Sequence, residues 1–535
     1  MLRLKNRGYP YAQVLRNFDE DDALLTAGAT LELVPGPRMR IGEVEIQGLA
    51  RVDTGTVRGL LRVKPSDLFR QDLLYQSQRD LYGLGVFRSV SVVLADSLAP
   101  TAPGDSLVRV VVHVAEGPGH RVLTGVGYGT IDCFRLQEGW TAYNYFGGAR
   151  ALDLTGTVSK IGVGAPLDAG LRSNLCRTLR GDSTSDTLNY NVGLTLRQPT
   201  FVSSRHSARL GVFAERRSEF KLYTRQDISV NPAVTFNARR NLPVTVGYTF
   251  SVGRTTADAA VFCSVFRVCS EADRSLLAGT HRFAAVTATA VRDRVNSVLD
   301  PTNGSLSTLA LMHASRLVGS DTLYEFNRGE LSLSRYYRLG RRGVFAWRAR
   351  AGMIVPAGNI SLASQNVRFV PPEQRFYGGG PNSVRGYARN ELGPRVYVLP
   401  ITINDSTGDT TRLPVQTKPT GGNASFVLNT ELRFATFLFP DRMRVALFVD
   451  VGQVWERGDQ PTGVRGVRVT PGMGLRFATL LGPVRIDAAY NGYAAEPGPL
   501  YIQYLKDLTL TDETYQPTKT FWQRIVVQFA VGQAF

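Results

Sequence analysis

The sequence predicts a mainly β protein, a sixteen-stranded antiparallel transmembrane β-barrel preceded by small α+β structure. From His120 onward, runs that alternate apolar and polar residues recur at regular spacing, which is typical of strands with two unlike faces. Short turns and longer loops alternate between these runs, and the tally is about sixteen, an even number. No run approaches the roughly 18 uninterrupted apolar residues of a membrane helix. A chain that spans a membrane without such a helix does so as a closed barrel.

Between residues 39 and 118 the pattern changes and predicts a small α+β domain. The stretch IGEVEIQGL is a strand, and a short helix follows it, opened by Asp53 or Thr54. A longer helix comes next, with Ser66 and Asp67 expected to cap its start. Two further strands, FRSVSVVL and SLVRVVVHVAEG, are expected to pair with each other.

The predicted boundaries divide the chain into three parts. Residues 1–38 hold a helix and a strand, and we expect them to be the C-terminal half of a preceding copy of the small domain. Residues 119–535 form the predicted barrel, with a long inserted loop, the sixth on the outer side, around 358–422. Met1 opens without a signal peptide, although a barrel of an outer membrane must be exported. We therefore expect that the natural sequence begins upstream, with an unknown number of further domains.

Two runs near the C-terminus each carry one acid on the face opposite their apolar residues. Glu431 lies in SFVLNTELRF, and Asp450 lies in VALFVDVGQVW on the same face as Phe448 and Gly452. A barrel in lipid turns its apolar faces outward, so both acids are expected in the lumen. Arg385 lies on the long polar loop upstream, and if that loop folds inward, its side chain can pair with either acid or both.

These motifs resemble the BamA/TamA superfamily of outer-membrane assembly factors, which also includes the transporters of two-partner secretion. The likeness rests on F-x-D-x-G at Asp450, on N-x-E-x-R at Glu431, and on a terminal strand that ends at an aromatic, Phe535. The small α+β domain resembles a POTRA domain, most specifically in GVFRSVSV. The most specific piece of the barrel is the VRGY motif, formed by Val384, Arg385, Gly386 and Tyr387.

The resemblance implies that the sixth outer loop folds into the lumen, where Arg385 meets Asp450 and Glu431. A guanidinium offers a planar fork to carboxylates and stays charged when partly desolvated. We expect such a pair to fix the position of the loop more than it adds net stability, because desolvation offsets most of the attraction. The alternative is an exposed loop arginine and a hydrated carboxylate in the pore.

The first predicted barrel strand, VLTGVGYGT, carries three glycines on one face and has to close against the terminal strand. Glycines weaken a strand. In the resembled family this seam opens laterally and accepts a client strand by edge pairing, which we adopt as a hypothesis. Alternatively, the glycines only make room for the inserted loop. The expected seam residues are Gly125, Gly127, Gly129, Phe529, Gly532 and Phe535.

All four cysteines fall in segments assigned to the outer rim. Cys263 and Cys269 are near enough in sequence to close a small loop, whereas Cys133 with Cys176 would join the first two outer loops. Disulfides suit an oxidising exterior. The sequence alone leaves both the pairing and free thiols open. No C-x-x-C pair is present and no histidine lies near these cysteines, so we expect no metal site.

Other function classes find little support. The net charge of +17 allows nucleic-acid binding, but the arginines are spread through strands and turns rather than gathered in a basic helix, so no nucleic acid is expected. Neither G-x-S-x-G nor a P-loop is present, so we expect no enzyme and no cofactor. Turn arginines are expected either to meet lipid phosphates at one rim or to be solvated only: Arg205, Arg239, Arg240, Arg341, Arg342 and Arg442.

The expected function is therefore that of a factor that inserts or translocates outer-membrane proteins through a laterally opening seam. Its POTRA domain would lie in the periplasm and its barrel in the bacterial outer membrane. The expected partners are outer-membrane lipid, unfolded outer-membrane client proteins, and periplasmic or lipoprotein accessory proteins. A two-partner secretion transporter that exports an extended polypeptide is the first alternative. A passive diffusion channel is the second, although it leaves the POTRA domain and the VRGY loop without a purpose.

Overall fold

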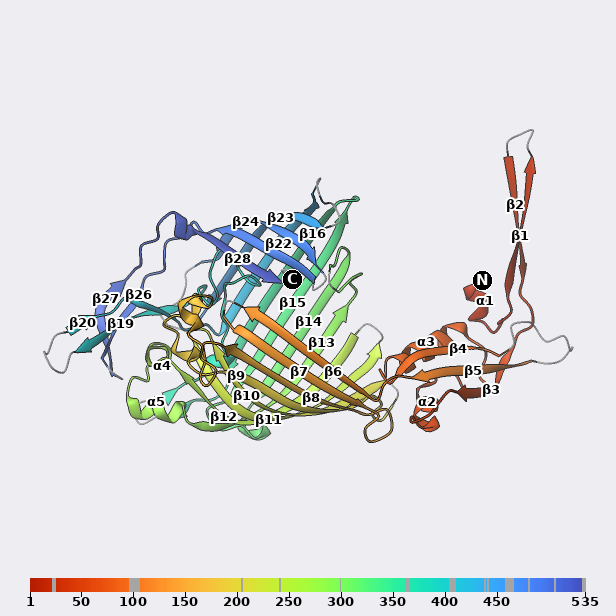
Figure 1. Ribbon diagram of the computed structural model, residues 1–535, viewed down its shortest axis with the longest axis horizontal. Helices are drawn as coiled ribbons and strands as arrows, with labels where there is room; N and C mark the ends of the chain where they lie inside the picture. The colour runs from red at the N-terminus through yellow and green to blue at the C-terminus, as the bar shows by residue number, and fades with distance from the viewer. Residues whose placement is uncertain are drawn as a thin grey trace. The chain divides into compact units, whose positions relative to one another are not determined.

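A computed structural model gives the fold of the chain (Figure 1). Among the residues that it describes, no helix is long and apolar enough to cross a membrane. It describes residues 1–535 except 22–25, 96–105, 130, 204, 240–241, 299, 362–365, 404–409, 437–438, 440–441, 458–465, 480–481, 505–506 and 532–535.

The small domain has the predicted order of strand, two helices and two strands. Its three strands form one sheet in the order β3-β5-β4, with β3 parallel to β5 and β4 antiparallel to it. The apolar faces of the helices and of this sheet form one core. The elements are β3 (Arg40–Gln47), α2 (Thr54–Leu60), α3 (Gln71–Tyr82), β4 (Phe87–Leu94) and β5 (Leu107–Glu116).

The two helices of this domain begin differently. Asp53 caps α2 as predicted, because its carboxylate accepts a hydrogen bond of 2.7 Å from the amide of Thr56. The prediction that Ser66 and Asp67 cap the longer helix is wrong. Ser66 has a φ of 72°, outside the helical region, and the carboxylate of Asp67 instead accepts from the amide of Lys64. Helix α3 therefore starts about one turn later.

The N-terminal segment holds a short helix and a β-hairpin. The hairpin strands are antiparallel over their whole length. That this segment is half of a preceding domain remains a prediction. The elements are α1 (Leu2–Lys5), β1 (Gln13–Asp21) and β2 (Thr26–Val34).

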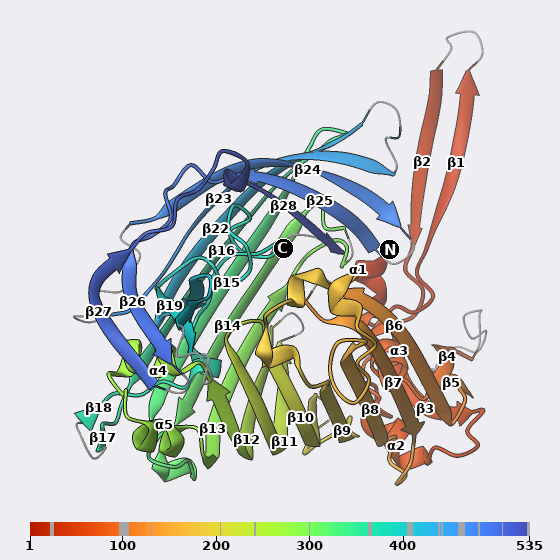
Figure 2. The ribbon, with the colours of Figure 1, turned by 60° about the vertical axis from the view of Figure 1, so that its left-hand side comes forward.

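Sixteen strands form one antiparallel sheet, which confirms the predicted fold class (Figures 1 and 2). Consecutive strands are neighbours throughout, and β28 and β6 are the two ends of the order. The strands are β6 (His120–Gly129), β7 (Cys133–Tyr143), β8 (Ala151–Ile161), β9 (Asn189–Gln198), β10 (His206–Glu219), β11 (Tyr223–Arg239), β12 (Leu242–Ala257), β13 (Thr280–Asp293), β14 (Gly304–Ala314), β15 (Phe326–Leu339), β16 (Gly343–Pro356), β22 (Ala424–Ala435), β23 (Met443–Trp455), β24 (Arg468–Thr479), β25 (Gly482–Tyr490) and β28 (Ile525–Val531).

Alternation along each strand decides which side chains face lipid and which face the lumen. On β23, Leu447 and Val449 are exposed on the outer wall, whereas Phe448 and Asp450 are buried. This pattern follows because successive strand residues point to opposite faces and only apolar side chains are tolerated against lipid.

The long connections between strands lie at the same end of the sixteen-stranded sheet, which we call the outer side. There a second sheet has the order β20-β19-β26-β27, and its parallel pair β19 and β26 joins the sixth loop to the loop between β25 and β28. The elements are α4 (Ala259–Phe266), α5 (Glu271–Leu277), β17 (Ile360–Ser361), β18 (Asn366–Val367), β19 (Arg395–Ile403), β20 (Thr410–Arg412), β21 (Gln416–Pro419), β26 (Gly498–Tyr504) and β27 (Asp507–Tyr515), with 3-10 turns at Leu171–Ser173, Arg177–Leu179, Ser183–Ser185, Arg316–Val318, Pro372–Gln374 and Trp522–Arg524.

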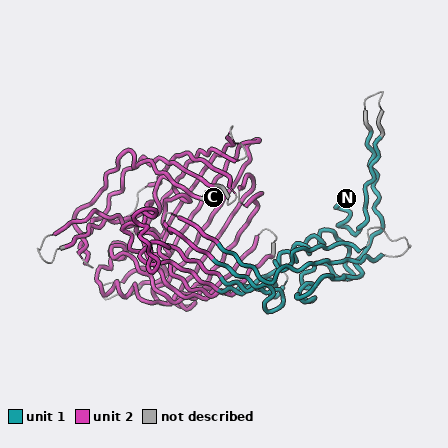
Figure 3. The backbone as a smooth tube through the Cα atoms, viewed as in Figure 1, with its two compact units in different colours: residues 1–124, 138–154, 194–209 teal, residues 125–137, 155–193, 210–535 magenta. Residues whose placement is uncertain are grey.

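The chain divides into two compact units (Figure 3). Unit 1 contains residues 1–124, 138–154 and 194–209. These ranges hold the N-terminal segment, the small domain and one end of each of the strands β6 to β10. Unit 2 contains the rest of the barrel and all of the sixth loop.

Candidate functional site

The sixth loop places Arg385 among acidic side chains of the lumen wall. Its Nε and Nη2 donate to the two carboxylate oxygens of Asp450, at 2.7 and 2.8 Å. Its Nη1 donates to Glu431 at 2.8 Å, and its backbone amide donates to Asp450 at 3.0 Å. The side chains of all three residues are at most 1% exposed. The two acids that the sequence assigned to Arg385 are thus the residues that contact it.

The site contains further charges that sequence reasoning did not assign. Asp487 on β25 lies 3.7 Å from Arg385 Nη1 and accepts from Arg476 at 2.6 Å. Glu431 also accepts from Arg433 at 2.9 Å and from Arg476 at 3.1 Å. Glu431 and Asp487 are therefore each shared between several guanidinium groups, whereas Asp450 is held by Arg385 and by the amide of Asn429, so each buried charge is compensated. The signal for Asp487 was its lumen face in GPVRIDAAY, but nothing local indicated its neighbours.

Close backbone approaches explain the motif glycines. A Cβ at Gly452 would stand 2.5 Å from the side chain of Val384, and a Cβ at Gly386 would stand 2.4 Å from that of Thr470. These distances are shorter than van der Waals contact, so the loop seats against the wall only where glycine is present.

An aromatic ring completes the seat of the arginine. The Cζ of Arg385 lies 3.3 Å from the centroid of the Phe448 ring, which makes a cation–π contact in a desolvated place. The ring itself fits because Gly472 on the next strand has no side chain: a Cβ there would lie 2.3 Å from it. Each residue of F-x-D-x-G thus has its own role. Phe448 places a ring against the guanidinium, Asp450 binds it, and Gly452 leaves space for the loop.

Amide side chains hold the backbone of the same motif. The Nδ2 of Asn491 donates to the carbonyl of Gly386 at 2.9 Å. The Nε2 of Gln528, on the terminal strand, donates to the carbonyls of Arg385 and Tyr387 at 2.8 and 2.9 Å. Three successive carbonyls of VRGY therefore accept hydrogen bonds from the wall, and no local pattern predicted either donor.

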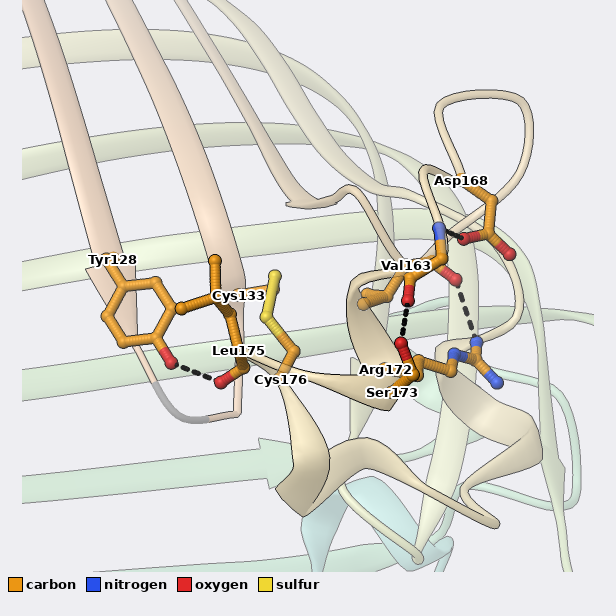
Figure 4. Close-up of a disulfide and its surroundings, with 9 residues drawn as sticks. Tyr128, Cys133, Val163, Asp168, Arg172, Ser173, Leu175 and Cys176 are labelled. Atoms are coloured by element: carbon orange, nitrogen blue, oxygen red, sulfur yellow. Dashed lines mark hydrogen bonds between the residues drawn. A yellow bond between two sulfur atoms is a disulfide. The ribbon is translucent and has the colours of Figure 1, made fainter.

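The predicted seam lies between the two ends of the sheet. Among the residues described, no ladder joins β28 to β6, and β28 pairs only with β25. Val126 on β6 and Phe529 on β28 are 85% and 62% exposed. Gly532 and Phe535, which were also predicted to line the seam, lie outside the described residues. At the outer end of β6, the hydroxyl of Tyr128 donates to the carbonyl of Leu175 at 2.7 Å, which holds this strand end to the loop after β8 (Figure 4).

Among the residues described, no atom of the inserted loop lies within 4 Å of a Cβ built at any of the three glycines of β6. A Cβ at Gly125, Gly127 or Gly129 would meet, within 4 Å, only described atoms of β7 and of the turn before it. The alternative role for these glycines therefore has no support in the described contacts.

A cavity of about 1350 Å³ is lined by the sixth loop, other connections between strands and the terminal strand. Gly129 at the end of β6, Gln528 on β28 and Arg389 on the sixth loop all line it. The cavity thus connects the seam region with the loop.

Both cysteine pairs form disulfides, Cys133 with Cys176 and Cys263 with Cys269 (Figure 4 shows the first). The first joins the start of β7 to the loop after β8, and the second joins α4, which contains Cys263, to the segment that follows this helix. In the described part of the chain, no group of three histidine, cysteine, aspartate or glutamate side chains could hold a metal ion.

Several of the turn arginines lie in described parts of the chain. Arg205, Arg341 and Arg442 are exposed. Arg240 lies outside the described residues. Contact of these side chains with lipid phosphates remains a prediction.

Two family models match the chain. The Omp85 superfamily domain matches residues 144–535, and the POTRA model, described as a surface antigen variable number repeat, matches residues 39–117. The outer membrane protein assembly factor BamA of Neisseria meningitidis serogroup B is 23% identical over 474 residues, which are 85% of this chain and 51% of that protein. The chain thus spans about half the length of this curated relative.

Solved structures share the fold. BamA from Haemophilus ducreyi lacking POTRA domains 1–3 superposes with a TM-score of 0.63 at 17% identity, covering 98% of this chain and 91% of that one. CdiB from Escherichia coli gives a TM-score of 0.50 at 13% identity, covering 98% and 80%. The barrel lies in the outer membrane and the POTRA domain in the periplasm. With a family model that spans most of the barrel, the chain belongs to the Omp85 superfamily.

Proposed function

We propose that this protein inserts outer-membrane β-barrel proteins by pairing a client strand with the free edge of β6. The observation that carries the proposal is that β6 and β28 end the sixteen-strand order with no ladder between them in the described residues. An unpaired strand edge presents a row of backbone donors and acceptors, which is a template for another strand. In lipid those groups have no water to satisfy them, so an incoming strand is strongly favoured.

Features of β6 support its role as the receiving edge. Three glycines lower the cost of separating this strand from a neighbour. Among the residues described, β28 pairs with β25 from Ile525 to Val531, so the edge of β28 that faces β6 carries no described ladder.

The POTRA domain provides a second strand edge on the periplasmic side. In its sheet, β3 and β4 are both edge strands, with β5 between them. We propose that unfolded client proteins, and periplasmic or lipoprotein accessory proteins, bind there by the same edge pairing. Energy would come from client folding and from distortion of the membrane rather than from covalent chemistry.

A disulfide across the seam tests the proposal. One cysteine is placed on β6 at Gly125, Gly127 or Gly129 and one on β28 at Val527 or Phe529, and the pair that cross-links best is used. The assembly of a model barrel client is then measured with and without reductant. We expect assembly to stop when the seam is locked and to return on reduction, because the edge is then free again. Unimpaired assembly with the seam fully cross-linked would overturn the proposal.

A matched control uses strands that already pair. Ala488 on β25 lies opposite Val527 in the register, so Ala488→Cys with Val527→Cys adds a disulfide without closing the seam. This lock should leave client insertion possible. A loss equal to that of the seam lock would mean that any cross-link in this region disables the protein.

The same assay separates this function from the transport of an extended polypeptide. If the protein is instead a two-partner secretion transporter, the locked seam leaves secretion of the partner polypeptide intact while client barrels assemble normally without the protein. The fold alone does not choose between the two, since both kinds of relative share it.

A further inference from the structure

Gln528 lies on the terminal strand β28, and its side chain bonds to the backbone of the VRGY motif. Its Nε2 donates to the carbonyl of Arg385 at 2.8 Å and to that of Tyr387 at 2.9 Å. On the strand ladder it lies opposite Asp487, which belongs to the charge cluster around Arg385. The terminal strand therefore contacts the loop at the same level at which the arginine is seated.

The contact does little for the barrel itself. The Oε1 of Gln528 is buried and has no hydrogen-bond partner in the described part of the chain, which is unfavourable for a carboxamide. Both donated bonds go to the loop and none to β25. An apolar side chain of the same shape would suit the wall at least as well, so the glutamine is explained by the loop.

The accepting groups are backbone carbonyls, and this has a mechanical consequence. A backbone carbonyl cannot turn away by a change of rotamer, and both bonds come from one Nε2, so a displacement of the strand breaks the two bonds together unless the Gln528 side chain follows the loop. The neighbouring donor, Asn491, follows the end of β25 and holds Gly386 in the same way. The loop is thus fastened to the strand that stays in the wall and to the strand at the seam.

We propose that Gln528 is a positioning residue that couples the seating of the VRGY loop to the position of the terminal strand. Displacement of β28 at the seam pulls on the Gln528 bonds and loosens the loop, and a seated loop holds β28 in place. The inference deepens the proposed function, and rests on it for the claim that the seam beside β28 opens while a client strand enters.

The test reads the loop directly. Val384 is fully buried when the loop is seated, so Val384→Cys becomes reactive to a maleimide when the loop leaves its site. The four native cysteines are in disulfides and do not react. In this background, Gln528→Met removes the donor and keeps the size, and Gln528→Glu turns acceptors toward the carbonyls. Heat-modifiable migration of the barrel shows that each variant folds.

We expect labelling of the cysteine to be about tenfold faster with Gln528→Met, as the loss of two ordinary hydrogen bonds implies. Gln528→Glu should be faster still. The matched control is Gln523→Met, because Gln523 lies in the same terminal segment but its side chain accepts from the amide of Thr520 and makes no described contact with the loop. Labelling at the parent rate in both Gln528 variants would overturn the inference.

A second measurement separates coupling from a local packing effect. Locking β28 to β25 through Ala488→Cys and Val527→Cys should slow labelling severalfold when Gln528 is present and leave it unchanged with Gln528→Met. Equal slowing in both backgrounds would show that the strand and the loop are not linked through Gln528. The labelling measurements do not depend on client assembly. A result against the role of Gln528 is therefore distinguishable from a result of the seam lock against the proposed function.

Discussion

Two arginines of the sixth loop bind carboxylates with the same two-pronged geometry but in different surroundings. Arg385 binds Asp450 where the side chains are 1% and 0% exposed. Arg389, four residues on, binds Glu219 of β10 at 2.8 and 2.9 Å, and its side chain is 48% exposed. The first pair fastens the loop to the wall that ends at β28, and the second fastens it to the opposite side of the lumen.

Burial, rather than geometry, decides how strongly such an ion pair holds the loop in place. An exposed pair is screened by water and contributes little, whereas removal of one partner from a buried pair leaves a charge without compensation. The loop is therefore held by the wall of β22–β25 and β28. If β28 is displaced at the seam, we expect the exposed contact to Glu219 to break before the buried contacts of the loop do.

The largest effect is expected at the buried pair. Arg385→Glu or Asp450→Arg puts like charges together out of water, and we expect a cost of about 3–5 kcal/mol in loop seating. Client assembly and the reactivity of a cysteine at Val384 measure it. The exchange of both charges, Arg385→Asp with Asp450→Arg, should restore part of the activity. Full activity of both single variants would remove the loop seat from the mechanism.

A steric change where the loop packs against the wall should weaken loop binding less than the charge changes do. Gly452→Ala places a Cβ 2.5 Å from Val384, and we expect about 1–3 kcal/mol of loss in loop seating, because packed side chains shift only partly. The measurement is client assembly with Val384 unchanged, because Val384→Cys would remove the methyl group that the new Cβ meets. Gly156→Ala on β8 is the control, because no atom of the described residues lies within 4 Å of a Cβ built there. Equal effects of the two changes would mean that glycine flexibility, not space, matters.

A carboxylate of the POTRA domain extends the comparison to pH. Burial by itself would raise the pKa of Glu116, but hydrogen bonds from the amides of Val52, Ala50 and Arg51 lower it from 4.5 to about 2. The charged form is thus favoured in the folded state. Its contribution to stability is present above pH 4.5 and is lost as the pH falls towards about 2.

Hydrogen exchange of the amides at 50–52 in the full-length chain measures this loss, after correction for the intrinsic rates. We expect protection to fall as the pH is lowered through that window, and Glu116→Gln to weaken protection at neutral pH and to flatten the dependence. Glu43→Gln is the control, because Glu43 has no described hydrogen bond to these amides. Unchanged protection in Glu116→Gln would contradict the assignment.

The smallest effect is expected at the exposed pair. Arg389→Ala should change loop seating by no more than about 1 kcal/mol, and added salt should weaken the parent contact. Labelling at Val384→Cys at two salt concentrations tests this. A loss as large as that of Arg385→Glu would show that exposure does not decide the strength of these contacts.

Alternation along the strands was enough to predict half of the site. The period of two placed Glu431 and Asp450 on one face of their strands, and the need for apolar side chains against lipid turned that face into the lumen. The tally of strands and the order of elements in the POTRA domain also followed from local patterns. The start of α3 did not, because Ser66 takes a left-handed backbone conformation that no propensity indicates.

The sequence by itself thus determined the fold class, the faces of the strands and the side chains that could enter the lumen, because these depend on neighbours a few residues apart. Only the tertiary structure decided that Asp487 joins the cluster, that Asn491 and Gln528 hold the VRGY carbonyls, and which cysteines pair. Those contacts depend on the register between strands and on the path of a long loop. Both are set by packing over distances along the chain that leave no local pattern.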